Sequence, residues 1–158
     1  MIIGIDVGIK GAIALLNGDH LVWVKDMPTV TKVVGGRKRT RIDARTLYEM
    51  VEDQHIDHAF IEIVGAMPNQ GVTSMFAFGQ ASGIAEGVCA CVTPNVTGVR
   101  PQTWKKHFKL GSDKVQSRLL ASHLFAEHAD RFNRVKDDGR AEAALIGLWG
   151  CETLWGKV

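Results

Sequence analysis

The chain has few cysteines and no long uninterrupted run of apolar residues. Its three cysteines (Cys89, Cys91 and Cys151) form neither an even disulfide set nor a zinc spacing, and no histidine cluster supplies other zinc ligands. No apolar run approaches the roughly 20 residues that a membrane helix needs. The opening MIIGIDVG carries an aspartate inside its apolar stretch, which argues against a signal peptide. We therefore expect a cytoplasmic protein.

A large excess of charge of one sign is also missing, since 19 Lys and Arg face 17 Asp and Glu. The basic residues are nevertheless clustered. A single run of charge is usually a solvated surface, but two clusters in so short a chain favour a polyanionic partner such as nucleic acid. The first cluster consists of Lys32, Arg37, Lys38, Arg39 and Arg41, and the second of Arg100, Lys105, Lys106, Lys109, Lys114 and Arg118.

The length of 158 residues fits one domain, 1–158, and the 46% of apolar residues is ordinary for a globular protein. The opening predicts three antiparallel strands, followed by helices that alternate with strands. This order is typical of an α/β fold with a mixed sheet. Strands are expected over 2–7, 12–16, 21–25, 58–64 and 96–99, and helices from Asp43, over 73–90, from Pro101, from a Ser112 cap to about 128, and over about 137–148.

Two acids lie inside strands that are otherwise apolar. Asp6 follows IIGI, and Glu62 lies within HAFIEIV. Burying an unpaired carboxylate is costly, so each acid needs a basic partner or a bound cation. A salt bridge would explain either one alone, but two such acids on separate central strands favour a common cation.

The last helix adds two further acids on its inward face. At about 100° per residue, Asp138 and Glu142 share a stripe with Leu145 and Trp149. An N-cap role would explain one aspartate but not Glu142, which lies a full turn inside the helix. Four carboxylates from two strands and a helix form an oxygen-rich site suited to Mg²⁺ or Mn²⁺, and such sites hydrolyse phosphodiesters.

Four ordered segments resemble the RuvC family of Holliday junction resolvases, most closely its bacteriophage-type members. The GIDxG segment alone is weak, because sugar kinases and actin-like ATPases use a similar phosphate loop, but the ordered set of four is specific. The segments are GIDVGIKGAIAL, FIEIVGAMPNQGVTSMFAFGQASG, VRPQTWKKHF and KDDGRAEAALIGL, and together they cover nearly the whole chain. The resemblance implies an RNase H-like fold, with a mixed five-stranded sheet flanked by helices, in the host cytoplasm if the source is viral.

The resemblance also implies roles for residues. Two Mg²⁺ ions, for which Mn²⁺ substitutes, would be held by Asp6, Glu62, Asp138 and Glu142, while Lys105 and Lys114 would approach the scissile or neighbouring phosphates. The helix over 73–90 matches the dimer-forming helix of the family, consistent with glycines at every fourth position. Further DNA contacts are predicted from the basic clusters, at Lys32, Arg37, Lys38, Arg39, Arg41 and Lys106.

The sequence departs from the family pattern in three places. Bacterial members carry two aspartates three residues apart on the last helix, so either Asp137 or Asp138 could be the ligand here. They also carry a wedge aromatic soon after the strand glutamate, whereas Val64 to Pro68 has none, and Phe76 and Phe78 are expected in the core. The segment 32–41 looks longer than the family norm, and we predict that it is a DNA-gripping loop.

The leading hypothesis is a Mg²⁺-dependent endonuclease that resolves Holliday junctions by two-metal hydrolysis and leaves 5′-phosphate nicks. Within the nuclease class, the missing wedge favours a broader enzyme that also cuts replication forks and flaps. A non-catalytic junction-binding module is an alternative from another class. A phosphate-loop ATPase or sugar kinase needs two such domains, and the chain supplies one.

Overall fold

A mixed five-stranded sheet forms the centre of the molecule. The computed structural model describes residues 1–63, 65 and 71–156. The strand order is β3-β2-β1-β6-β7; β1 pairs antiparallel with β2 and parallel with β6. The predicted three-stranded opening and the mixed five-stranded sheet are both confirmed. The strands are β1 (Ile2–Asp6), β2 (Ala12–Asn17), β3 (His20–Asp26), β6 (His58–Glu62) and β7 (Val96–Val99).

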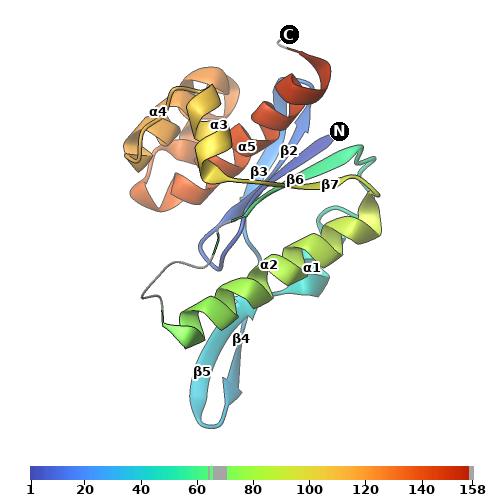
Figure 1. Ribbon diagram of the computed structural model, residues 1–158, viewed down its shortest axis with the longest axis vertical. Helices are drawn as coiled ribbons and strands as arrows, with labels where there is room; N and C mark the ends of the chain where they lie inside the picture. The colour runs from blue at the N-terminus through green and yellow to red at the C-terminus, as the bar shows by residue number, and fades with distance from the viewer. Residues whose placement is uncertain (64, 66–70, 157–158) are drawn as a thin grey trace.

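Helices cover both faces of this sheet (Figure 1). One core cluster joins the α5 face of the sheet to Trp104 and Phe132, and the other joins the opposite face to Leu47 and Ala85. β1 is apolar on both sides because it lies between these two layers. The first face carries α3 (Pro101–His107), α4 (Lys114–Leu124) and α5 (Asp138–Trp155), with 3₁₀ turns η1 (Ala126–Phe132) and η2 (Val135–Asp137), and the second carries α1 (Ala44–Glu49) and α2 (Val72–Val92).

Several predicted helix ends need correction. The prediction of an Asp43 cap is confirmed, since its carboxylate accepts hydrogen bonds from the backbone amides of Arg45 and Thr46. Pro101 is the first helical residue, as expected. The Ser112 cap is wrong, because Asp113 accepts the hydrogen bond from Val115 N. The helix that follows ends at Leu124 rather than near 128, and the last helix continues to Trp155.

The predicted basic loop is instead a β-hairpin. β4 (Thr29–Val34) pairs antiparallel with β5 (Arg37–Ile42), and Val34 lies opposite Arg37. The two residues between them, Gly35 and Gly36, have φ of 57° and 74°. Positive φ at both central positions is what a two-residue type I′ hairpin turn requires, so the glycine pair specifies a turn. The hairpin extends from the body past α2 (Figure 1).

Helix α2 is less buried than its composition suggested. Only Ala81, Ala85, Val88 and Cys89 are buried, whereas Phe76 is 74% exposed, so its expected place in the core is wrong. By length and composition α2 could cross a membrane, contrary to the expectation from apolar runs, and it is the one such helix in the described part of the chain. Its buried face packs on the sheet in the second core cluster.

A close contact between α5 and β1 fixes the depth of the site. A Cβ built on Gly4 would lie 2.2 Å from Ala143 O and 2.4 Å from Gly147 N. No side chain fits in that space, so glycine at this strand position allows the helix backbone to lie directly on the strand. This contact carries Glu142, one residue before Ala143, toward the end of β1.

Candidate metal and DNA-binding site

The two strand acids end neighbouring parallel strands. The register pairs Ile5 with Ile61, and Asp6 and Glu62 each follow by one residue. Parallel strands present their carboxyl ends at one edge of a sheet, so both carboxylates lie at that edge. Glu62 is only 7% exposed, although it is ionisable. The sequence pattern therefore identified two residues that the fold brings together.

Glu142 completes this group from α5. It is 4% exposed and is buried within a helix that is apolar on nearly every side. A Cβ built on Gly139 would lie 2.9 Å from Asp6 Oδ2, so the first turn of α5 packs directly against the Asp6 side chain. Helix α5 thus places one carboxylate beside the two from the strands.

Neighbouring carboxylates raise the pKa of both Asp6 and Glu62. Burial, then the charges of Glu142 and Glu62, raise the pKa of Asp6 from 3.8 to about 8, while Lys114 and Lys105 oppose this rise. Burial and the charge of Glu142 also raise the pKa of Glu62. Within the described residues the Asp6 carboxylate has no ion-pair partner. The Asp6 carboxyl therefore keeps its proton at neutral pH, because the two lysines do not offset burial and the two neighbouring carboxylates.

Trp104 holds Glu62 in position. The indole Nε1 of this fully buried residue donates a hydrogen bond of 2.9 Å to Glu62 Oε1. The bond favours the ionised form of Glu62, although burial dominates its pKa. The sequence pattern alone assigns no role to Trp104. The only available signal was a large aromatic directly before the basic pair Lys105 and Lys106.

Two lysines supply positive charge at the same place. Lys105 Nζ lies 3.1 Å from Glu142 Oε1, and Lys114 Nζ lies 3.6 Å from Glu142 Oε2. Lys105 is mostly buried, whereas the side chain of Lys114 is 58% exposed. Lys114 can therefore exchange its carboxylate partner for a ligand phosphate with little loss of packing.

The acids that precede Glu142 have other partners. Asp138 forms an ion pair with Arg118, so the structure does not bring its carboxylate together with the other three. Asp137 is buried; burial alone would raise its pKa, but hydrogen bonds from Arg134 and the charge of Arg140 lower it overall. Asp137 is thus held in a structural contact. Of these two aspartates, Asp138 is the one that lines the cleft described next.

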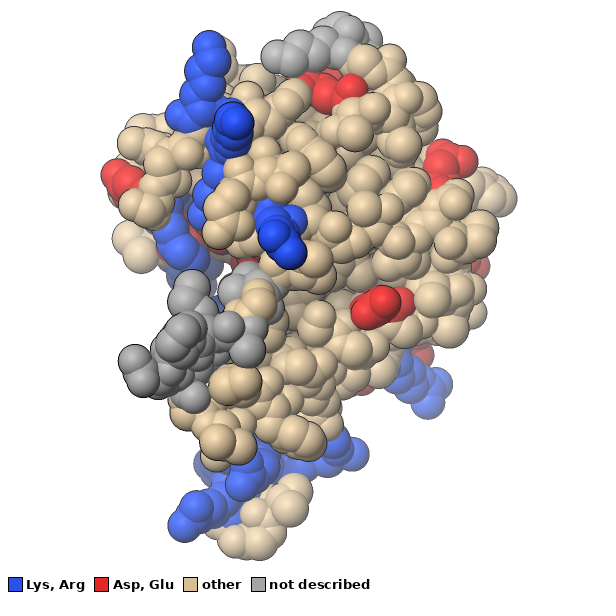
Figure 2. All heavy atoms as spheres, in the orientation of Figure 1, with Lys and Arg blue, Asp and Glu red and all other residues tan. Residues whose placement is uncertain are grey.

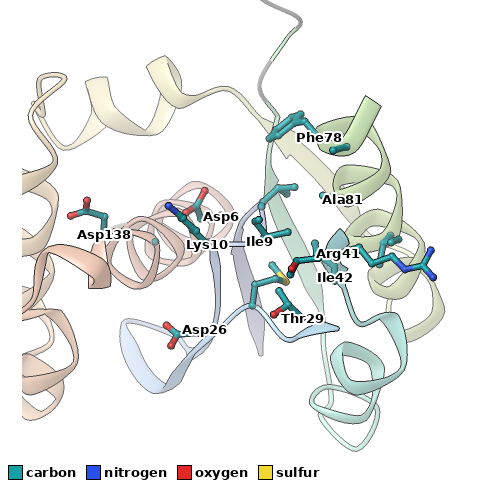
Figure 3. A pocket seen from close by; sticks show the side chains of 18 of the residues that line it. Asp6, Ile9, Lys10, Asp26, Thr29, Arg41, Ile42, Phe78, Ala81 and Asp138 are labelled. Atoms are coloured by element: carbon teal, nitrogen blue, oxygen red, sulfur yellow. The ribbon is translucent and has the colours of Figure 1, made fainter. Parts of the chain in front are cut away.

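A cleft of about 1090 Å³ opens in front of Asp6 (Figure 3). Its wall includes the loop after β1, the start of α5 and the buried side of α2, with Ile9, Phe78 and Ala81 as apolar members. Thr40 and Arg41 line it from the base of the hairpin. The cleft therefore connects Asp6, the member of the acid group that lines it, to the base of a basic surface element.

The carboxylate oxygens of Asp6, Glu62 and Glu142 are suitable ligands for a divalent cation. Within the described ranges no three His, Cys, Asp or Glu side chains are clustered tightly enough to hold a metal as they stand, because Glu142 faces lysines and Asp138 faces Arg118. Glu142 nevertheless lies close enough to raise the pKa of both Asp6 and Glu62, which groups the three carboxylates at one place. All the donor atoms are carboxylate oxygens, which Mg²⁺ prefers. A dication would offset the cost of ionising Asp6.

Basic side chains gather at two ends of one face of the molecule (Figure 2). One group lies over the α3 and α4 region, and the other lies on the hairpin, beyond the sheet. The predicted DNA-binding residues therefore form two separate surfaces, with Asp6 in the cleft between the α5 layer and the hairpin base.

Comparison with known proteins gives structural matches only. No family model matches the chain, and no curated protein matches it. Thermus thermophilus RuvC in complex with Holliday junction substrate aligns with a TM-score of 0.62 at 13% identity, over 98% of this chain and 96% of the other. Another Thermus thermophilus RuvC structure gives 0.59 at 15% identity over the same shares. Fowlpox virus resolvase, in complex with Holliday junction DNA, gives 0.54 at 16% identity, over 97% and 99%.

These matches establish the fold class. The chain has the RNase H-like fold of these resolvases, which confirms the fold that the sequence resemblance implied. At identities of 13–16% the likeness concerns architecture, so the chemistry must be argued from the residues at the site.

Proposed function

We propose that this protein is a metal-dependent nuclease that resolves Holliday junctions and related branched DNA. The observation that carries the proposal is the group of Asp6, Glu62 and Glu142, three acids that share one electrostatic site at a cleft, beside two lysines. An acid left unpaired in such a place is a functional-site candidate because it destabilises the apo protein. The RNase H-like fold and its junction-bound neighbours support the substrate class.

Asp6, Glu62 and Glu142 would hold Mg²⁺, with Mn²⁺ as a substitute, and Asp138 would join them on leaving Arg118. Bound magnesium supplies Lewis-acid activation of water and stabilisation of a leaving oxygen. The hydrogen bond from Trp104 restrains Glu62 Oε1 and so orients the rest of that carboxylate. The expected products are nicks with 5′-phosphate ends.

The lysines have a second role in this proposal. Lys105 and Lys114 neutralise Glu142 in the absence of substrate. When a phosphodiester and a metal ion bind, the ammonium groups of the two lysines can turn toward the phosphate oxygens instead. Lys106 is exposed and follows Lys105 on the short helix α3, so it would contact a neighbouring phosphate. This exchange keeps the charge of the site balanced both with and without DNA.

We propose that the active form is a homodimer joined through α2. The outer face of this helix carries Phe76 beside three glycines, Gly79, Gly83 and Gly87. A Cβ built on any of these glycines meets no atom of the described residues within 4 Å, so packing among those residues does not require glycine at these positions. Glycines every four residues allow a second helix to approach closely, and a dimer could make paired nicks.

A cleavage panel tests the proposal. Four-way junction, three-way junction, flap and plain duplex are incubated with Mg²⁺ or Mn²⁺, and we expect cutting of the four-way junction. Asp6→Asn and Glu62→Gln each remove one metal-binding charge, so cleavage should fall at least about 100-fold, more than outer-shell changes usually cause. Junction binding should survive in both variants.

Two matched substitutions serve as controls. Asp53→Asn and Glu49→Gln remove exposed carboxylates near α1 and should leave cleavage intact. Retained cutting by Asp6→Asn would defeat the mechanism. Binding without cutting by the wild type, under either metal, would indicate a junction-binding module, and efficient cutting of forks and flaps would indicate a broader debranching nuclease.

A further inference from the structure

The β4–β5 hairpin has two chemically different faces. Every residue from 31 to 41 is exposed. In an antiparallel ribbon, residues that lie opposite each other point to the same side. The register pairs Val30 with Arg41, Lys32 with Arg39, and Val34 with Arg37, and these three alternate pairs form one face. That face carries four of the five basic residues of the hairpin.

The opposite face is nearly uncharged. Thr31 pairs with Thr40, and their hydroxyl oxygens are 2.8 Å apart, which confirms that opposed side chains lie side by side. Val33 pairs with Lys38, the single cation on this face, and Ile42 at its base is buried in the core. The alternation of side chains along the two strands therefore places four of the five cations on one face of the hairpin.

The cations of the basic face have no acidic partners in the described part of the chain. No ion pair there involves Lys32, Arg37, Arg39 or Arg41, whereas Lys105, Lys114 and Arg118 all pair with acids. Four like charges placed side by side repel one another, which destabilises an isolated ribbon. An anionic ligand would relieve this repulsion.

The dimensions fit duplex DNA. Strands of six residues span about 20 Å, and a two-stranded ribbon fits the major groove, which is about 12 Å wide. The segment from Thr29 to Ile42 has no aromatic residue, so it offers no platform for stacking unpaired bases. Thr40 and Arg41 line the same cleft as Asp6, so DNA that enters the cleft meets the base of the ribbon.

We propose that the ribbon lies along the groove of a duplex arm, with the Lys32, Arg37, Arg39 and Arg41 face toward the phosphates. This inference rests on the proposed function and deepens it by naming double-stranded DNA as the ligand of this element. The ribbon holds one arm at a distance from the cut site, and the acids act on a phosphate in the cleft.

Binding to a synthetic four-way junction in EDTA tests the sidedness without cleavage. The Lys32→Ala/Arg39→Ala variant should raise Kd about tenfold or more and lower the slope of log Kd against log salt by about 2, since each phosphate contact contributes about 0.9. Lys38→Ala should weaken binding less than Arg39→Ala. Lys25→Ala, an exposed cation on β3, is the control and should change Kd less than twofold.

A charge-matched variant separates sidedness from net charge. Exchange of the faces by Thr31→Lys, Lys32→Thr, Arg39→Thr and Thr40→Arg keeps the charge of the hairpin unchanged, and binding should remain as weak as in the double alanine variant. Wild-type affinity in this variant, or an unchanged Kd in the double variant, overturns the inference. Affinity for a single-stranded oligonucleotide should change little, and an equal loss there contradicts groove binding. Failure of the proposed function would appear separately, as an uncut junction with Mg²⁺.

Discussion

Asp6 has three properties that are not expected together in a residue with only a structural role. It ends a central strand, it has no ion-pair partner among the described residues, and burial with two neighbouring acids raises its pKa to about 8. An unpaired carboxyl of this kind lowers the stability of the metal-free protein. Its retention at this position is explained if a cation binds there.

The Asp6 pKa predicts how stability depends on pH. The folded protein holds this proton up to about pH 8, whereas an unfolded chain releases it near 3.8, so stability decreases as pH rises between these values. Each pKa unit corresponds to about 1.4 kcal/mol. Asparagine cannot ionise, so Asp6→Asn removes the cost of ionising this buried group. If only half of the pKa shift applies, the variant should be more stable than the wild type by about 3 kcal/mol at pH 8.5 and equally stable below pH 4.

Urea denaturation in EDTA from pH 3.5 to 9 measures this effect. Asp53→Asn, at an exposed position, is the control and should show no such rise with pH. A pH-independent difference between wild type and Asp6→Asn would mean that the Asp6 proton is not bound as described.

The ion pair between Asp138 and Arg118 shows that residue identity alone does not decide which acid of the last helix is free to bind a metal. On the helical stripe Asp138 and Glu142 are equivalent, and sequence favoured both as ligands. In the structure Arg118 comes from α4, and its position beside Asp138 depends on how α4 packs against α5. A single-sequence pattern contains no information on that packing.

At the scale of elements, α2 has two faces of different character. The buried face contributes Ala81, Ala85 and Val88 to the sheet layer. The exposed face carries glycines at which an added Cβ would meet no atom of the described residues within 4 Å. Glycine costs a helix about 1 kcal/mol relative to alanine, so an open position would ordinarily favour alanine. Close approach by a second copy, as proposed above, would explain the glycines.

Substitution of Gly83 tests the interface. Gly83→Glu places a charge at the centre of the proposed contact, so we expect a monomer by sedimentation at concentrations where the wild type is a dimer. Thr73→Glu, at an exposed position of the same helix away from the glycine stripe, should leave the dimer intact. A wild type that sediments as a monomer at all concentrations would contradict the α2 interface.

On the scale of the whole molecule, the sheet edge brings together parts distant in sequence. Asp6 and Glu62 come from adjacent parallel strands, and Glu142 comes from the helix that lies on β1. The site exists only in the folded chain, so metal that binds there must stabilise the fold.

Thermal unfolding with and without Mg²⁺ measures this linkage. At a Mg²⁺ concentration ten times Kd the stabilisation is about 1.4 kcal/mol, which raises Tm by about 3–6 °C for a chain of this size. NaCl at equal ionic strength is the control and should not reproduce the shift. Glu62→Gln should lose most of it, and an equal shift in that variant would place the metal elsewhere.

The sequence by itself determined the sheet, the order of its elements and the three acids that the fold groups together, Asp6, Glu62 and Glu142. These features follow from local periodicity and from the cost of placing a carboxylate in an apolar strand, both of which can be evaluated without a partner. The Trp104 contact to Glu62, the diversion of Asp138 to Arg118 and the opening of α2 to solvent were decided by the tertiary structure. Each depends on which elements lie side by side, and that is a property of the packed molecule. The hairpin lies between these cases: its glycine turn and strand alternation were present in the sequence, but pairing was needed to separate its charged and uncharged faces.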